Sequence, residues 1–447
     1  MIDAELATQA VQSALDSGAR DAECTLAEGE EFSARVRMRA LETVTDAGSR
    51  AAGLRVLVGR NVGCSYTSDL SSEGIRKLVA SALEIAAISS EDPHAGLPEP
   101  SELGSLTTDL ALYSDDINTI DASRRIEQAL ETEEAALSAD PRITNSNGAS
   151  FDAVNGERVF ANSRGFVGSY RVSTCALSTS PVAREGDSME RDYWFSYARS
   201  HAKLESPAAI GRRAAERTLR RLGARKVPTQ KVPVVFDPMT ARTLLGNIFE
   251  AVEGEAIYRN ASFLAGKAGQ RVASENVTII DDGTIPGLFG TSPFDDEGVP
   301  TRRTVVIDRG VLRSYLLNSY TARKLGLRTT GNAARAITGN ASIGHGNLFL
   351  EKGERSPEEI VKSVRRGLYV TELIGTGVNI VTGDYSRGAA GLWIENGEFA
   401  YPVSEITIAS NLRQMLMDIE SAGSDLEFRG SVAAPTLLIR EMTVSGQ

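Results

Sequence analysis

The sequence predicts an α+β protein, with an N-terminal domain of helices and antiparallel sheet over residues 1–226 and a β-rich C-terminal domain over residues 227–447. Three observations lead to this prediction. The N-terminal half twice shows the order helix, antiparallel strands, helix, and a polar, proline-containing joint at 225–231 follows it. Beyond one further helix, strand-like runs and glycine turns dominate. A chain of 447 residues is also long enough for two or three domains with sizeable cores.

The first block, residues 1–88, begins with an amphipathic helix over 4–17. Turn residues separate the short strands that follow and predict an antiparallel meander over 24–26, 31–38, 41–47 and 51–58. A helix over 72–87 closes the block, because its apolar residues recur at i, i+3, i+4 and i+7. Residues 89–105 are rich in Pro, Ser, Glu and Gly, which indicates a linker.

The second block, residues 119–223, repeats this order. We expect a helix over 121–138, a second helix over 207–222 and, between them, strands over 144–151, 157–162, 166–179 and 192–199. The blocks are either a diverged duplication or two halves of one layered domain. The last helix carries a basic patch, interpreted as a solvated face, that consists of Arg212, Arg213, Arg217, Arg220 and Arg221.

The C-terminal domain opens with a strand over 232–236 and a helix that Asp237 caps, with Pro238 at its first position. Apolar residues at helical spacing predict a buried face made of Leu244, Leu245, Ile248, Phe249 and Val252. We expect further helices over 356–366 and 408–422. The predicted strands lie over 303–308, 311–317, 368–373, 378–382, 391–395, 399–405 and 436–444.

Composition excludes several classes of protein. A net charge of −11 argues against general nucleic-acid binding. Three scattered cysteines favour free thiols in a reducing cytoplasm. The acidic N-terminus lacks the pattern of a signal peptide, and no apolar run reaches membrane-spanning length.

The sharpest catalytic candidate is Glu250, near the end of the helix that Asp237 caps. Zinc peptidase helices carry histidines around a Glu, because neutral imidazoles hold the metal and the Glu acts on its water. Here the Glu is present without histidines. Glu250 would need a raised pKa to act alone as a general acid; the alternative is an exposed or hydrogen-bonded helix residue.

Other polar motifs are weaker signals. Two Ser-Arg-Gly turns, at 163–165 and 386–388, lack the Gly-x-Ser-x-Gly elbow of a serine hydrolase. Three adjacent carboxylates at 295–297 could hold Ca²⁺ or Mg²⁺, but their spacing favours a solvated turn. Candidates for contact with a peptide or a partner subunit are Asn162, Arg164, His345, Asp384, Ser386 and Arg387.

The C-terminal half contains, in order, the motifs FEAVEGEAI, TIIDDGTIPGLFGTSPFDDEGV, VTELIGTGVNIVTGDYSRGAAGLWIENGEFAYPVSEITIASNL and SDLEFRGS. Together they resemble the TldD/PmbA family. The run from GDYSRGA to YPVSEITIA is similar to its PmbA (TldE) branch. The resemblance covers about Val232 to Gln447, and ERVFANSRG at 157–165 is consistent with it.

This resemblance implies a dimer, commonly a heterodimer, that encloses a peptide-cleaving zinc site. In the TldD branch the metal helix carries His-Glu-x-x-x-His and a later Cys completes the ligands. Here the two histidine positions hold Phe249 and Gly254, and no Cys follows Cys175. We therefore expect no metal ligands and no cofactor in this chain, and zinc in a TldD-like partner.

The resulting expectation is a cytoplasmic PmbA-like subunit of a peptidase assembly that degrades or matures unstructured peptides. The partner would be a TldD-like chain in a heterodimer or a second copy in a homodimer. Two alternatives remain open. One is a hydrolase that is active alone, and the other is a binding or regulatory protein, such as a DNA-gyrase-linked modulator.

Overall fold

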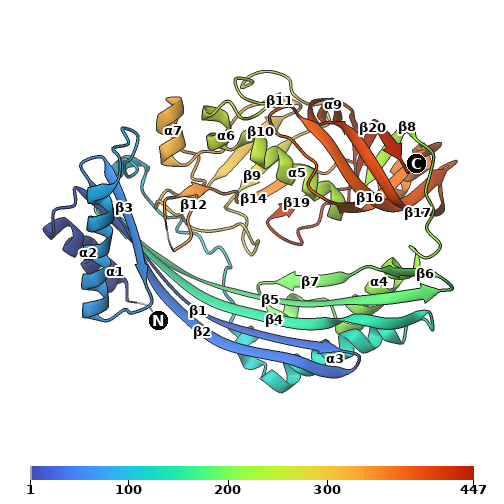
Figure 1. Ribbon diagram of the computed structural model, residues 1–447, viewed down its shortest axis with the longest axis horizontal. Helices are drawn as coiled ribbons and strands as arrows, with labels where there is room; N and C mark the ends of the chain where they lie inside the picture. Colours follow the sequence, from blue (N-terminus) through green and yellow to red (C-terminus); the bar gives the residue numbers. More distant parts are fainter. Residues whose placement is uncertain (1–2, 338, 447) are drawn as a thin grey trace.

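The computed structural model describes residues 3–337 and 339–446 and shows an α+β protein in two layers (Figure 1). A long, curved antiparallel sheet with its helices forms one layer, and a β-rich domain forms the other. The predicted fold class is confirmed.

The N-terminal sheet has the strand order β3-β2-β1-β4-β5-β6, and β7 pairs with β5. Antiparallel pairing of β1 with β4 joins the two sequence blocks, from Glu23 opposite Asn162 to Val36 opposite Ala149. The two blocks therefore share one sheet. Its strands are β1 (Asp21–Arg37), β2 (Ala40–Val58), β3 (Asn61–Thr67), β4 (Ile143–Asn162), β5 (Val167–Glu185), β6 (Ser188–Arg191) and β7 (Trp194–Ala198).

Strands β1, β2 and β4 are 17, 19 and 20 residues long, whereas the sequence predicted each as two shorter strands. The predicted breaks fell at glycine-rich or charged positions. These positions align across the sheet, with Gly29 opposite Gly156 and Glu30 opposite Gly48. Pairing continues through them because it depends on backbone groups, which glycine also supplies.

The helices α1 (Ala4–Asp16), α2 (Ser72–Ile88), α3 (Ala122–Leu137) and α4 (Pro207–Leu219) pack on one face of this sheet. Strand β1 shows the pattern. Leu26 lies in a core with α1 and α2, and Phe32 lies in a second core with α3 and α4. Because alternate residues of a strand point to opposite faces, odd-numbered Glu23 points away from the helices, towards the C-terminal domain.

The C-terminal domain contains a six-stranded sheet, β17-β16-β15-β8-β20-β18, and a five-stranded sheet, β11-β10-β9-β14-β19. A single core cluster joins these two sheets through α5. The first sheet comprises β8 (Gln230–Phe236), β15 (Arg366–Ile374), β16 (Asp384–Glu395), β17 (Glu398–Asn411), β18 (Ile419–Ala422) and β20 (Leu437–Ser445). The second comprises β9 (Ile279–Asp282), β10 (Arg303–Asp308), β11 (Val311–Leu312), β14 (Asn347–Leu350) and β19 (Val432–Ala433).

The remaining elements are short. Two strands form a separate pair, β12 (Ala333–Ala334) and β13 (Ser342–Ile343). The helices of this domain are α5 (Pro238–Val252), α6 (Gly254–Tyr258), α7 (Ser319–Leu325), α8 (Pro357–Ser363) and α9 (Leu412–Met417).

Three predictions for this domain are wrong. The expected helix over 408–422 is the end of β17, the short α9 and β18, and buried Ile406 and Ile408 alternate with exposed neighbours as strand residues do. The expected strand over 378–382 is a turn, in a segment that holds Gly375, Gly377 and Gly383. The expected strand over 311–317 ends at Leu312.

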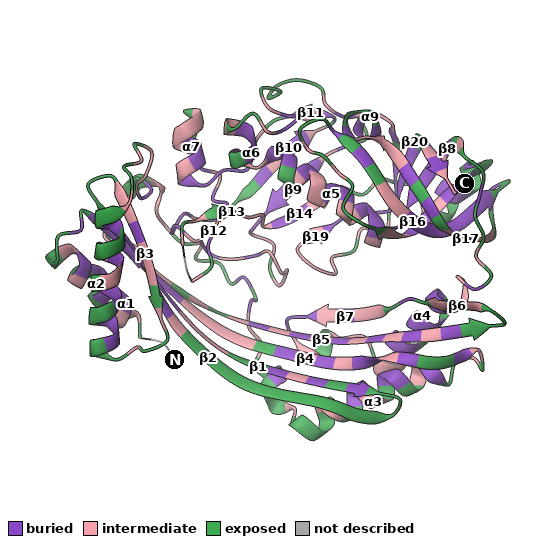
Figure 2. Ribbon diagram, in the orientation of Figure 1, coloured by how far each residue is buried: buried purple, intermediate pink, exposed green. Residues whose placement is uncertain are grey.

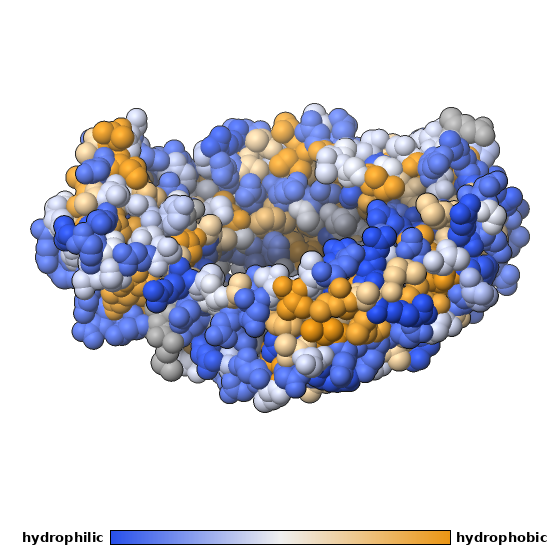
Figure 3. Space-filling view, turned by 60° about the horizontal axis from the view of Figure 1, so that its bottom comes forward, coloured by the Kyte–Doolittle hydropathy of each residue, from blue (hydrophilic) through white to orange (hydrophobic). Residues whose placement is uncertain are grey.

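No helix in the described part of the chain is long and apolar enough to cross a membrane. The molecular surface is hollowed near its centre, between the N-terminal sheet and the C-terminal domain (Figure 3). Three cavities have walls from both layers.

Candidate functional site

Helix α5 positions the predicted catalytic residue at its C-terminal end. Asp237 caps the helix, since its side chain accepts the N–H of Thr240. The helix ends at Val252 because Glu253 has an extended backbone, and the N–H of Gly254 donates to the carbonyl of Leu316 (2.9 Å). This break separates residue 254, the second of the two histidine positions that the resemblance implies, from the helix that carries the first, residue 249.

Phe249, in the last turn of α5, packs edge-to-face against His345, with ring centroids 4.9 Å apart at 86°. The Nδ1 atom of His345 lies 2.9 Å from the carbonyl oxygen of Gly346. The structure thus brings His345, a predicted contact residue, next to Phe249, which occupies the first of these histidine positions. Glu250 is exposed, and its side chain has no hydrogen bond or ion pair with any residue that the structure describes.

His345 lines a cavity of about 160 Å³ between the two layers. Arg158 and Tyr170 line it from the N-terminal sheet, and Asp281 lines it from β9. Asp281 is 2% exposed; its Oδ2 accepts from the Nδ2 of Asn332 (2.7 Å), and its Oδ1 has no hydrogen-bond partner among the described residues. Burial raises the pKa of Asp281 to about 6, although Asn332 and His345 oppose the shift. A carboxyl group with such a pKa can exchange protons near neutral pH.

The acidic loop beside this cavity is not the solvated turn that the sequence favoured. Asp295 and Glu297 are 5% and 4% exposed. Asp295 accepts the N–H groups of Glu297, Val299 and Ala333, at 2.9 to 3.0 Å, so it fixes the loop from inside. Burial raises the pKa of both carboxyl groups, and their mutual repulsion raises that of Asp295 further.

The residues at the end of α5 do not fit a zinc site. A structural or catalytic zinc needs three or four nitrogen, sulfur or oxygen ligands. The described residues hold no group of three or more His, Cys, Asp or Glu side chains placed to bind one ion. At Gly254, a Cβ would lie 2.5 Å from the Oγ1 of Thr321 and 2.7 Å from Leu317, so a side chain is excluded without movement of α7.

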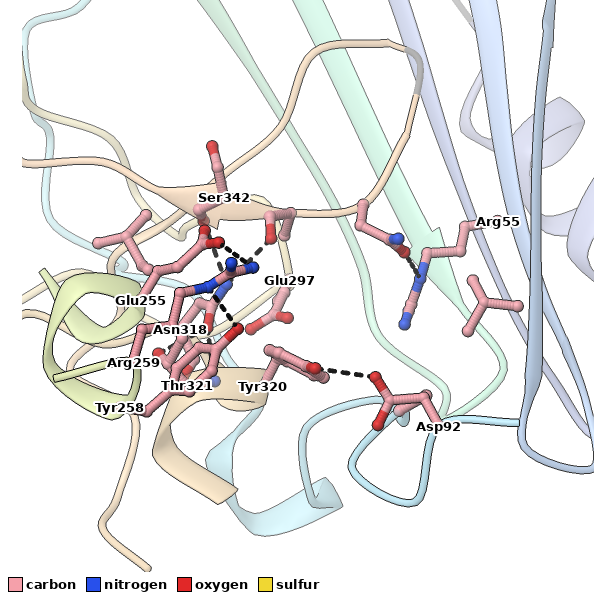
Figure 4. Close-up of a pocket in the computed structure, with 15 residues that line it drawn as sticks. Arg55, Asp92, Glu255, Tyr258, Arg259, Glu297, Asn318, Tyr320, Thr321 and Ser342 are labelled. Atoms are coloured by element: carbon pink, nitrogen blue, oxygen red, sulfur yellow. Dashed lines mark hydrogen bonds and ion pairs between the residues drawn. The ribbon is translucent and has the colours of Figure 1, made fainter. Parts of the chain in front are cut away.

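A larger cavity, of about 240 Å³, lies beside α6 and α7 (Figure 4). Arg55 forms the wall opposite Glu255, and Glu297 lies between them. The hydroxyl of Tyr320 donates to the carboxylate of Asp92 (2.8 Å) and so ties α7 to the linker. Polar and apolar side chains from segments distant in sequence line this cavity together.

The two Ser-Arg-Gly turns lie apart. Asn162 accepts the N–H groups of Arg164 and Phe166, and the guanidinium of Arg164 pairs with Asp21 (3.1 Å). These contacts organise the β4–β5 turn and give Asn162 and Arg164 a structural role.

Asp384 and Arg387 lie on β16, with the exposed Ser386 between them. The guanidinium of Arg387 donates to the Oγ1 of Thr243 on α5 (3.3 Å). Thr243 precedes Phe249 by six residues, about 9 Å along a helix axis. Arg387 and His345 therefore contact one helix at separate positions.

Sequence reasoning missed Asp281, Asp295 and Glu297 as buried groups. The signal available for Asp281 was its place directly after the apolar run of β9, whose four residues are all buried. Nothing local distinguished the loop of Asp295 from a solvated turn.

The chain matches three family models, described as PmbA/TldA metallopeptidase domain 1 (residues 22–86), central domain (115–222) and C-terminal domain (229–446). It is 39% identical over 442 residues to Metalloprotease PmbA of Escherichia coli O157:H7, which covers 98% of this chain and 96% of that protein. A crystal structure from Bacteroides thetaiotaomicron, called a putative modulator of DNA gyrase, is similar at TM-score 0.92 and 28% identity over 99% of this chain and 98% of that one. The structure of TldE from Thermococcus kodakarensis has the same fold, at TM-score 0.89 and 22% identity over 99% and 100% of the two chains.

Proposed function

The chain belongs to the TldD/PmbA metallopeptidase family, and we propose that it is the subunit of a peptidase assembly that holds substrate without holding zinc. In this proposal, a TldD-like partner supplies the metal and the chemistry of peptide cleavage. The single observation that carries the proposal is the environment of α5, where Phe249 and Gly254 stand at the family's histidine positions.

The packing at these two positions supports the proposal. Phe249 presents an apolar ring to His345, and Gly254 is pressed against α7 with no space for a Cβ. Glu250 keeps the position of the family's glutamate, but its carboxylate is exposed and has no described partner that could hold it for catalysis.

The N-terminal sheet offers a place for an extended peptide. Residues 40–50 of β2 are exposed (Figure 2). In the described structure, this stretch pairs only with β1, because β3 covers only Ala52–Val58. A free edge binds an added strand through backbone hydrogen bonds and tolerates varied side chains. We infer an unstructured peptide as the substrate class.

The test is to purify the chain alone and together with a TldD-type partner from the same organism, and then to measure bound zinc and cleavage of an unstructured peptide. We expect neither stoichiometric zinc nor cleavage from the chain alone, and both from the complex. Zinc binding or cleavage by the chain alone would contradict the proposal, and Glu250→Gln would then locate the chemistry.

A regulatory role without peptidase partner is the second candidate, because the Bacteroides thetaiotaomicron relative is called a putative modulator of DNA gyrase. Supercoiling by purified gyrase, measured with and without the chain, separates the two. A stoichiometric change in supercoiling with no TldD-type partner present would favour the regulatory role.

A further inference from the structure

A third cavity, of about 290 Å³, lies at the opposite end of α5, where the helix begins beside α4. It is separate from the two cavities at the C-terminal end of α5. Five arginines from both layers line it: Arg213, Arg217, Arg220, Arg242 and Arg429. Three of them, Arg213, Arg217 and Arg220, belong to the basic patch of the sequence. The patch was interpreted as a solvated face, and this interpretation is wrong for the side that faces the cavity. The side chain of Arg217 is 7% exposed.

Three of these arginines are already matched by carboxylates, and one of them, Arg213, pairs with Glu216 on its own helix at 3.3 Å. Arg217 pairs with Asp192 at 3.2 Å and faces Asp237 at 3.7 Å. Arg429 pairs with Glu205 at 2.8 Å and with Glu427 at 2.9 Å. The Arg217–Asp237 and Arg429–Glu205 contacts join the N-terminal layer to the C-terminal domain around the cavity.

Arg220 and Arg242 have no such match. Neither side chain forms an ion pair or hydrogen bond with any residue that the structure describes, and the Nε and Nη2 atoms of Arg220 are buried. Burial lowers the pKa of Arg220 and repulsion from Arg217 lowers it further, although the more distant charges of Asp192 and Asp237 oppose the shift. A largely buried charge without an ion-pair partner is costly, so an anion that enters the cavity and pairs with Arg220 would be stabilised.

The carboxylates on the wall form no ion pair with Arg220 or Arg242 in the described structure, and two of them are engaged by other groups. Asp237 accepts the N–H and hydroxyl of Thr240 while it caps α5. Asp425 accepts the N–H and hydroxyl of Thr436. The positive end of the α5 dipole also opens here, since Pro238 and Met239 line the cavity.

We propose that this cavity is a binding site for a small organic oxyanion, with Arg220 and Arg242 as its charge partners. Guanidinium groups bind carboxylate and phosphate oxygens in the same forked geometry. A volume near 300 Å³ exceeds that of a bare ion and suits a small ligand. Two sources share this chemistry: the free carboxylate of a peptide C-terminus and the phosphate of a phosphate ester. The inference stands apart from the proposed function.

The experiment is calorimetric titration of the full chain, at constant ionic strength in chloride, with four probes. These are inorganic phosphate, adenosine monophosphate, triglycine and triglycine amide. We expect one saturable site. Preference for triglycine over its amide assigns the carboxylate source, and preference for adenosine monophosphate assigns the phosphate source. Absence of saturation by every probe up to about 10 mM, which corresponds to a binding free energy weaker than about −3 kcal/mol, overturns the proposal.

Variants locate the site. Arg220→Met and Arg242→Met should each weaken binding by about tenfold or more, the value of one charge-assisted hydrogen bond. Arg212→Met is the matched control, because Arg212 is exposed on α4 and does not line the cavity. Unchanged binding by both cavity variants contradicts the assignment.

A stability measurement separates binding from a structural role. Without added anion, Arg220→Met should unfold at the same temperature as the parent chain or higher, because a methionine removes a largely buried charge that forms no ion pair. Phosphate or peptide should raise the unfolding temperature of the parent chain and not that of the variant. A lowered unfolding temperature with an intact response to anions would show that Arg220 is structural.

Discussion

One buried carboxylate anchors a contact between the two layers, and its removal is a sharp test of the structure. The side chain of Glu23 is fully buried on the face of β1 opposite the helices. It accepts from Arg55 on β2 (2.7 Å) and from Arg335 in the C-terminal domain. The N–H of Arg335 donates to Asp296 (2.6 Å), which pairs with Arg158 of the N-terminal sheet (2.9 Å). Glu23 therefore anchors a charge network that fastens a C-terminal loop to the sheet.

Glu23→Gln keeps the size of the side chain and removes its charge, so two buried guanidinium groups lose their shared carboxylate. One such pair attracts by about 4 kcal/mol at 4 Å and an effective dielectric constant near 20. Desolvation offsets much of this attraction in the intact network, but the variant keeps the desolvated cations. We therefore expect a loss of about 3–5 kcal/mol, the range for breaking a buried pair from one side.

The pH dependence has a definite sign. Burial alone would raise the pKa of Glu23, but Arg335 and Arg55 together hold it below its ordinary value of 4.5. A carboxyl group with a lowered pKa stabilises the fold fully above its unfolded pKa and loses this contribution as the pH falls through its folded pKa. The difference between the parent chain and Glu23→Gln should therefore be constant near neutral pH and shrink below pH 4.5.

Urea unfolding provides the assay, with fluorescence of Trp194 followed in a Trp393→Phe background so that the signal comes from the N-terminal layer. Glu30→Gln is the matched control, because Glu30 lies on the same strand and is exposed; it should change stability by less than about 0.5 kcal/mol. If Glu23→Gln costs no more than this control at pH 7, the network does not hold the layers together and the reasoning fails.

Three further outcomes are expected. Gly254→Ala should destabilise the chain by about 1–3 kcal/mol through overpacking, whereas Gly246→Ala in the neighbouring helix α5, whose Cβ meets nothing within 4 Å, should not lower the unfolding temperature. Burial raises the pKa of Asp295 from its ordinary value of 3.8 to about 8. The contribution of this group to stability therefore falls as the pH rises between these two values, and urea titrations of Asp295→Asn should show a weaker pH dependence than those of the parent. In the native chain, a thiol reagent should modify only Cys64, as intact mass shows, because the other two cysteines are at most 1% exposed and burial raises their pKa to about 12; an adduct on Cys64→Ser contradicts this.

Local pattern was sufficient for most helices and for the class of fold. The apolar stripe of α2 and the Asp237 cap of α5 each stand where the sequence placed them, because helical periodicity and capping chemistry act within a few residues. The restriction to local sequence also caused the errors in strand length. Whether a polar stretch interrupts a strand depends on the neighbouring strand, and the alignment of Gly29 with Gly156 is invisible before the register is known.

The site was predictable only in part for a similar reason. His345 was chosen as a lone histidine, and the structure gives it Phe249 and Asp281 as neighbours through the pairing of β14 with β9. The buried state of Asp295 depends on backbone donors of residues 297, 299 and 333, the last of them nearly forty residues away. Burial by residues distant in sequence therefore raises the pKa of carboxyl groups that the local sequence predicted to be solvated.

The two histidine positions of the family differ in what their replacement means. A phenylalanine ring is close in shape to an imidazole, and the ring of Phe249 has His345 beside it, so Phe249→His is a permissive change at this site. Position 254 is different. Its Cβ site is occupied by Thr321 and Leu317, which the N-cap of α7 and the α5–α6 break hold in place. A histidine there requires the first turn of α7 to move, and close-packed interiors resist such shifts. The absence of the second ligand is therefore set by tertiary packing as well as by sequence, and restoring zinc binding in this chain would need changes in α7 together with those in α5.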